Sequence, residues 1–202
     1  MTGFARKTML AVAAATMTVA PAAPALAGWK LIEPGEQVKV AKGPMQVTPV
    51  GEWNRWTSRP VKKSETWTLD GTNLNEVYFI SGLPAGQTLY KDRNKKEAPL
   101  PKFKVNADIT DIPDFVESSM RVALQTSVFE LTGAEPASMG GQDAVRFTFE
   151  YAVEGSPLKR KGMATGTIKG GNLYLITYVA PATYFYDRDL AAVTQIMDSA
   201  AI

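Results

Sequence analysis

Residues 145–151, VRFTFEY, alternate between apolar and polar side chains without a break. Successive side chains of a β-strand point to opposite faces, so this period of two predicts a strand with one buried and one solvated face. Valine, two phenylalanines and a tyrosine fall on the first face, and arginine, threonine and glutamate fall on the second. A chain that contains this segment has to build a sheet and cover one of its faces.

Two more apolar segments follow, KGMATGTI at 161–168 and NLYLITYV at 172–179, and a short strand, SVFEL at 127–131, precedes them. The turn signals GSP at 155–157 and GGN at 170–172 separate the strands, which predicts an antiparallel meander. Because 172–179 is apolar on both faces, we expect it at the centre of the sheet with both sides covered.

The first half of the chain adds strands at the other side of the sheet. MQVTPV at 45–50 suits an edge strand, because its proline cannot donate a ladder hydrogen bond. ETWTLDG at 65–71 alternates, ends in the turn signal Asp-Gly, and is followed by the apolar run at 74–80, which predicts a hairpin. Residues 54–63 are interpreted as a polar, basic link between strands. Glu76 is interpreted as one of the residues of the hairpin turn.

Two helices complete the pattern, after a long, solvated loop over 81–107. Apolar residues recur at helical spacing over 112–125, with Asp111 in position to cap the helix, and again over 184–199. Strands, a helix, more strands and a final helix predict an α+β fold: a single antiparallel β-sheet with a mid-chain helix and a C-terminal helix packed on it.

Residues 1–27 have the pattern of a cleaved secretory signal peptide. A short basic region precedes the uncharged stretch 9–20, and small residues at Ala25 and Ala27 predict Sec-type cleavage after Ala27. The apolar run is too short to span a membrane, and no later segment is long and apolar enough. We therefore expect a mature single domain, 28–202, in the bacterial periplasm or secreted, although a eukaryotic secretory route stays open.

Charge and composition exclude several functions. Removing Arg6 and Lys7 from the 22 basic residues leaves 20, which equals the 20 acidic residues. A neutral exported chain whose aromatic residues do not interleave with its basic runs is a poor candidate for binding nucleic acid. The basic runs at 91–96 and 159–161 are interpreted as solvated loops, with anionic lipid or polysaccharide as the alternative.

The chain contains no histidine and no cysteine. It therefore lacks the commonest general base, thiol nucleophiles and disulfides, and we predict no catalytic residues, no metal site and no cofactor. The serine–lysine spacing of Ser156 and Lys159 matches S-x-x-K, but it falls in a predicted turn rather than at a helix start. We interpret that pair as a hairpin tip.

Carboxylates leave two further hypotheses open. Asp108, Asp111 and Asp114 are spaced by three and could offer oxygens to calcium, although the spacing is not that of an EF-hand loop and helix starts favour aspartate in any case. Glu52 and Glu65 flank the tryptophan-rich segment, which is compatible with a histidine-free, carboxylate-dependent glycan hydrolase.

Three of the four tryptophans, Trp53, Trp56 and Trp67, fall within fifteen positions. Trp67 lies on the alternating strand and is assigned to the core. Trp53 and Trp56 straddle Arg55 in a segment without a clear period and could share one side of a short helical turn. If both are exposed, Trp53, Arg55 and Trp56 form the best candidate contact surface for a partner.

Several segments resemble known proteins. WTLDG at 67–71, GLPAGQTLY at 82–90, PLPKF at 99–103 and the closing 173–200 resemble a group of uncharacterised exported proteins of Gram-negative bacteria. A strand ending in TYVAP, followed by a terminal helix that ends near a serine, also resembles the PsbP-like fold, an antiparallel sheet between helices. The resemblance implies that fold and an accessory role, and it carries no catalytic motif.

We therefore predict an exported, non-catalytic accessory or binding protein of the bacterial cell envelope. Its partner would be another envelope protein, or a small apolar or lipid ligand held between sheet and helix. The alternative is the carboxylate-dependent glycan hydrolase. A hydrolase should bring two carboxyl groups to about 5–10 Å in a cleft, whereas a binding protein should present an apolar or aromatic concavity.

Overall fold

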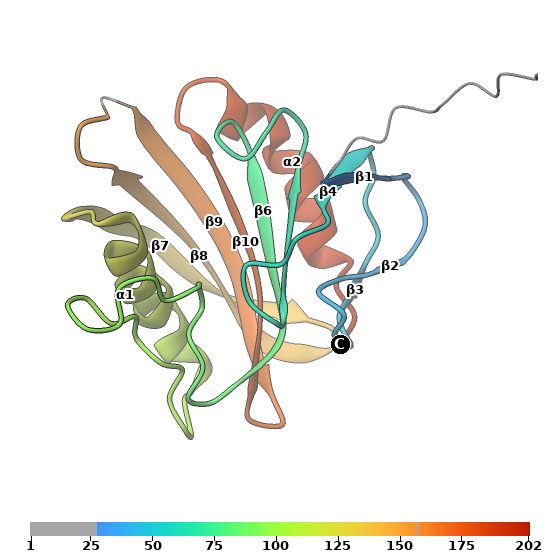
Figure 1. The fold of residues 1–202 in the computed structure, drawn as a ribbon. Coiled ribbons are helices and arrows are strands. Elements are labelled where there is room, and N and C mark those ends of the chain that lie inside the picture. The colour runs from blue at the N-terminus through green and yellow to red at the C-terminus, as the bar shows by residue number, and fades with distance from the viewer. Residues whose placement is uncertain (1–27, 157) are drawn as a thin grey trace, which may run out of the picture.

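A single eight-stranded antiparallel sheet forms the centre of the molecule, in the order β1-β4-β5-β6-β10-β9-β8-β7 (Figure 1). The structure is a computed structural model that describes residues 28–156 and 158–202, so the predicted signal peptide lies outside the described residues. The strands are β1 Trp29–Ile32, β4 Trp53–Trp56, β5 Ser64–Thr68, β6 Glu76–Pro84, β7 Val128–Met139, β8 Gln142–Ala152, β9 Lys159–Lys169 and β10 Asn172–Pro181. A separate two-stranded ribbon pairs β2, Val38–Lys39, with β3, Gln46–Val47.

The second half of the sheet is the predicted meander. Strands β8, β9 and β10 pair in sequence, and β10 lies between β6 and β9 with side chains buried on both of its faces, as its unbroken apolar sequence predicts. Gly170 and Gly171, both at positive φ, make the tight turn between β9 and β10. This conformation favours glycine over residues with a Cβ atom.

The two helices cover opposite faces of the sheet, which confirms the predicted α+β class (Figure 1). Helix α1, Ile112–Leu124, follows a 3₁₀ turn over Ile109–Asp111 and buries Val116 and Met120. Helix α2, Phe185–Asp198, buries Val193 and Met197 against the other face. Neither of these helices, nor any other in the described part of the chain, combines the length and apolarity needed to cross a bilayer.

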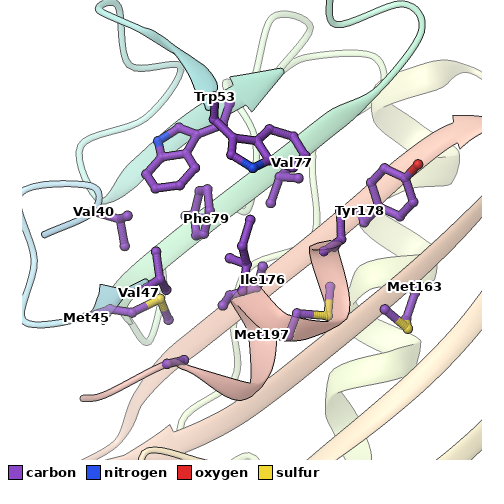
Figure 2. Packing of buried hydrophobic residues seen from close by; sticks show 14 of the residues in the cluster. Val40, Met45, Val47, Trp53, Val77, Phe79, Met163, Ile176, Tyr178 and Met197 are labelled. Atoms are coloured by element: carbon purple, nitrogen blue, oxygen red, sulfur yellow. The ribbon is translucent and has the colours of Figure 1, made fainter. Parts of the chain in front are cut away.

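Aromatic and aliphatic side chains fill the space between the sheet and α2 (Figure 2). Trp67 is fully buried, as predicted from its place on an alternating strand, and its ring packs 4.7 Å from that of Phe79 between centroids. Tyr178 and Met197 reach the same cluster from β10 and α2. This packing joins strands from both halves of the sequence without a disulfide.

Asn75 fixes the geometry of the predicted β5–β6 hairpin, which the strand pairing confirms. Its Oδ1 accepts hydrogen bonds from the backbone N–H groups of Leu69 and Asp70 at 2.8 and 3.0 Å. Its Nδ2 donates to the buried Asp189 carboxylate on α2 at 2.9 Å, and Arg188 bridges Asp189 and Asp70. The hairpin turn is therefore tied to the helix that covers the neighbouring strands.

The prediction of a link over 54–63 was wrong at its start, where Trp53–Trp56 forms β4 between β1 and β5. The prediction for 127–131 was too short, because β7 continues to Met139 in pairing with β8 along its whole length. The predicted loop over 81–107 begins later, since β6 runs to Pro84. In each case pairing with a neighbouring strand overrides a weak local pattern.

Candidate functional site

The predicted contact surface of Trp53, Arg55 and Trp56 does not form as one exposed patch. Residues three apart on a strand point to opposite faces, so β4 buries Trp53 to 1 % exposure and leaves Trp56 37 % exposed, stacked on Trp29. The Arg55 guanidinium pairs with the buried Glu65 carboxylate at 2.7 Å. Trp53 and Arg55 therefore have structural contacts, and Trp56 alone stays a candidate contact residue.

The residues proposed for a calcium site or for a glycan hydrolase have other roles or lie apart from a pocket. Glu65 is nearly inaccessible, and its oxygens also accept hydrogen bonds from the Trp67 indole at 2.8 Å and the Ala41 backbone N–H at 2.9 Å. Glu52 is exposed. Asp111 accepts a hydrogen bond from the backbone N–H of Asp108 at 2.9 Å, a helix-start role. No cluster of three metal-binding side chains occurs in residues 28–156 and 158–202.

A pocket of about 510 Å³ lies instead on the α1 side of the sheet. Its floor comes from β6, β8, β9 and β10, one wall is the C-terminal part of α1, and the loop after β6 forms the rest. The volume falls within the range of about 300–1,000 Å³ that is usual for small-molecule sites. Polar and apolar groups both line it, which makes it the strongest candidate site among the described residues.

Strand register brings the polar side chains of the floor together. Glu76 on β6 pairs with Val179 on β10, and Tyr78 pairs with Thr177, so alternate residues of both strands face the pocket. At the neighbouring strands, Tyr151 of β8 pairs with Arg160 of β9, and both also line it. These residues are distant in sequence, and the antiparallel sheet places them at the same end of adjacent strands.

The loop over 85–105 covers one side of the pocket and is held in place by a hydrogen-bonded base. Two backbone hydrogen bonds join the ends of the loop, each at 2.8 Å: the Gly86 N–H donates to the Phe103 carbonyl, and the Phe103 N–H donates to the Gln87 carbonyl. Leu89 and Phe103 are buried, and the Tyr78 hydroxyl donates to the Leu89 carbonyl at 2.8 Å. The loop was predicted as solvated, which holds for most of 91–99, whereas the buried Leu89, Leu100 and Phe103 pack its base against the domain.

Glu76 is the most perturbed acid in the pocket. Burial raises the pKa of its carboxyl from 4.5 to about 7 and outweighs the opposing effect of the Arg160 guanidinium. Arg160 in turn donates to the backbone carbonyl of Asn73 at 2.6 Å. Glu76 was predicted as a turn residue, but it is the first residue of β6 and its side chain lines the pocket.

Three tyrosines and a threonine line the same pocket as this acid. Burial raises the pKa of Tyr151 to about 12 and also raises the pKa values of Tyr78 and Tyr90, so all three phenols are neutral at physiological pH. The Thr177 hydroxyl is buried and makes no hydrogen bond within the described residues. Buried polar groups without partners are uncommon in native structures.

Sequence reasoning missed the pocket because no linear motif encodes it. Tyr151 was assigned to the apolar face of a strand, which is correct, but its side chain also lines the pocket. One local signal was present: an acidic residue, Glu76, that opens the otherwise apolar run VYFI of a central strand. A charge at such a position needs either solvent or a partner.

Comparison with known proteins identifies the fold. The structure is similar to cyanobacterial PsbP (CyanoP) from Synechocystis, with a TM-score of 0.53, 16% sequence identity, and coverage of 91% of this chain and 98% of that chain. It is also similar to the Ran-binding protein Mog1p of Saccharomyces cerevisiae, with a TM-score of 0.52, 7% identity, and coverage of 86% and 95%.

The chain therefore has the PsbP-like fold that its closing segment predicted. At these identities the likeness establishes the fold alone. No protein-family model matches the chain, and no curated protein matches it in sequence.

Proposed function

We propose that the protein is an exported, non-catalytic accessory protein of the bacterial cell envelope that holds a small amphipathic ligand in the pocket between the sheet and α1. The observation that carries this proposal is the pocket itself, which combines aliphatic walls with polar side chains on its floor, among them Glu76 and Tyr151.

The walls favour a ligand with a substantial apolar part. Met120 and Leu124 of α1, Leu100 of the loop and Val179 of β10 contribute aliphatic surface around the polar floor. Burying such surface against a ligand is worth about 25 cal/mol per Å², and a few placed polar groups then fix the orientation of the ligand. This division of roles is typical of small-molecule binding sites.

The cellular location in this proposal rests on the sequence. The predicted Sec-type signal peptide, with cleavage after Ala27, would deliver the domain to the periplasm or the outside of the cell. A fold held by its core without cysteine suits that delivery, because it needs no oxidation step after export. The resemblance to exported proteins of Gram-negative bacteria supports the same location.

A neutral apolar dye tests the pocket. N-phenyl-1-naphthylamine should bind the wild-type domain saturably with a rise in fluorescence. Val179→Phe, which fills the pocket floor, should weaken that binding at least about tenfold, a loss of about 1.4 kcal/mol. Val128→Phe places the same change on an exposed position of β7 outside the lining and is the matched control. Equal binding by all three proteins, or none by the wild type, would refute the proposal.

The glycan hydrolase stays as a second candidate because two carboxyl side chains, Glu76 and Asp92, line the same pocket. A pKa near 7 would suit Glu76 to donate a proton at neutral pH. Nitrophenyl glycosides distinguish the two functions. The binding proposal predicts no turnover by the wild type, whereas turnover that both Glu76→Gln and Asp92→Asn abolish would establish the hydrolase instead.

A further inference from the structure

We propose that the ligand of this pocket carries an organic ammonium group, which the Glu76 carboxylate and the surrounding tyrosine rings hold at the inner end. The inference rests on the proposed function and specifies its ligand class.

The Glu76 carboxylate has no protein counter-charge in contact. Glu76 is half-buried, and no hydrogen bond or ion pair of its carboxylate occurs within residues 28–156 and 158–202, although burial disfavours its charge. Carboxylates that are partly removed from water are normally paired or hydrogen-bonded. A cation that enters the pocket would supply the missing charge and favour the ionised form.

Tyrosine rings supply the second feature of a cation site. Tyr78 and Tyr90 lie with ring centroids 5.5 Å apart, and Tyr151 lines the pocket from β8. All three tyrosines line the same pocket as Glu76, and burial, the main cause of their raised pKa values, keeps their phenols neutral. Aromatic faces near a carboxylate attract alkylammonium groups through the quadrupole of the ring.

The basic groups around the pocket do not cancel this preference. Arg160 donates to the Asn73 carbonyl, so part of its guanidinium is already engaged, and burial still outweighs it at Glu76. Lys91 and Arg93 are exposed on the loop, and Asp92 lies between them. Exposed charges are well solvated and contribute little to binding, whereas a half-buried carboxylate such as that of Glu76 interacts more strongly. Helix α1 and strand β10 add no charged residue to the lining.

A series of three probes with the same alkyl chain tests the charge preference. Hexyltrimethylammonium, 1-hexanol and hexanoate are compared by isothermal titration near pH 8.5, above the Glu76 pKa of about 7. The cation should bind at least about tenfold more tightly than the alcohol. Glu76→Gln should remove this preference and keep the affinity for 1-hexanol, while Glu52→Gln, at an exposed position, should change neither.

The ring contribution has its own matched pair. Tyr90→Phe keeps the aromatic face and should retain cation binding within about twofold, whereas Tyr90→Leu should weaken it at least about threefold. Tyr90 is preferred over Tyr78 because the Tyr78 hydroxyl also holds the loop through Leu89. Equal losses in both variants would contradict a role for the ring face.

The outcomes separate this inference from the proposed function. Tighter binding of hexanoate than of hexyltrimethylammonium, or equal binding of all three probes, would overturn the ammonium proposal while N-phenyl-1-naphthylamine binding still supported the pocket. Failure of all three probes and of the dye to bind would overturn both.

Discussion

Replacing Glu76 with glutamine should stabilise the domain at alkaline pH and not at acidic pH. Burial raises the pKa of this carboxyl from 4.5 to about 7. Below pH 4.5 the group is protonated in the folded and the unfolded chain, so it costs nothing. Between pH 4.5 and 7 the unfolded chain releases the proton while the folded chain retains it, and the stability of the wild type falls as pH rises.

The size of the effect follows from the difference between the two pKa values. Each pKa unit is equivalent to about 1.4 kcal/mol, so a rise of about 2.5 costs the folded state about 3 kcal/mol once pH exceeds 7. Because the pocket leaves Glu76 partly hydrated, we regard about 3 kcal/mol as the upper end. Glu76→Gln is nearly isosteric, never ionises and escapes this cost.

Urea denaturation of the wild type and Glu76→Gln at intervals from about pH 4 to 9 measures the effect, since linear extrapolation to zero urea gives the free energy of unfolding. The advantage of the variant should grow through the window from 4.5 to 7 and then level off. Glu52→Gln, an exposed control outside the pocket, should stay within about 0.5 kcal/mol of the wild type. A difference between Glu76→Gln and wild type that does not change with pH would refute the reasoning.

Three further predictions concern the fold, the surface and export. Trp53→Ala should lower the free energy of unfolding by about 3–5 kcal/mol, because it leaves a large cavity in the core cluster that α2 covers. Trp56→Ala should lower it by less than about 1.5 kcal/mol in thermal or urea unfolding. A pull-down with Trp56→Ala then tests whether an envelope partner is lost. Gly162→Ala should destabilise the domain by at least about 2 kcal/mol, since the added Cβ would lie 2.1 Å from the Phe149 ring, and a urea midpoint equal to that of the wild type would disprove the contact. Mass spectrometry of the secreted or periplasmic protein should give a chain that begins at residue 28, and a retained Met1 would contradict export with cleavage.

The strands and helices with strong periodicity were predictable because their signals are local. The alternation of 145–151 and the helical spacing of 184–199 each define which face is buried before any partner is known. Both elements occur close to the predicted places, as β8 and α2. Short turns then force β7, β8, β9 and β10 to pair in sequence. The pairing of β6 with β10 joins strands that are distant in the chain, and no local signal predicts it.

Elements that depend on distant partners were not predictable in this way. The end of β7 contains Gly133 and Pro136, which disfavour a strand, but β7 lies at the sheet edge and pairs with β8, where proline is tolerated. The segment WNRW at 53–56 has no alternation because one tryptophan enters the core and the other stacks on Trp29.

The pocket depends on strand register, which no single segment encodes. Glu76, Tyr151 and Thr177 come from three strands and meet only when the sheet is assembled. Taken alone, Glu76 fits a solvated turn, Tyr151 an apolar strand face and Thr177 a central strand, as well as each fits a pocket. The pocket also depends on how α1 and the loop after β6 pack on the sheet, which the sequence of neither segment encodes.

A nuclear magnetic resonance titration with ¹³C-methyl methionine tests the pocket most directly. Met120 of α1 lines the pocket, whereas Met197 of α2 is buried on the opposite face of the sheet. Addition of N-phenyl-1-naphthylamine should shift the Met120 methyl signal saturably and leave the Met197 signal in place. A saturable shift at Met197 without one at Met120, or no shift at either, would contradict ligand binding between the sheet and α1.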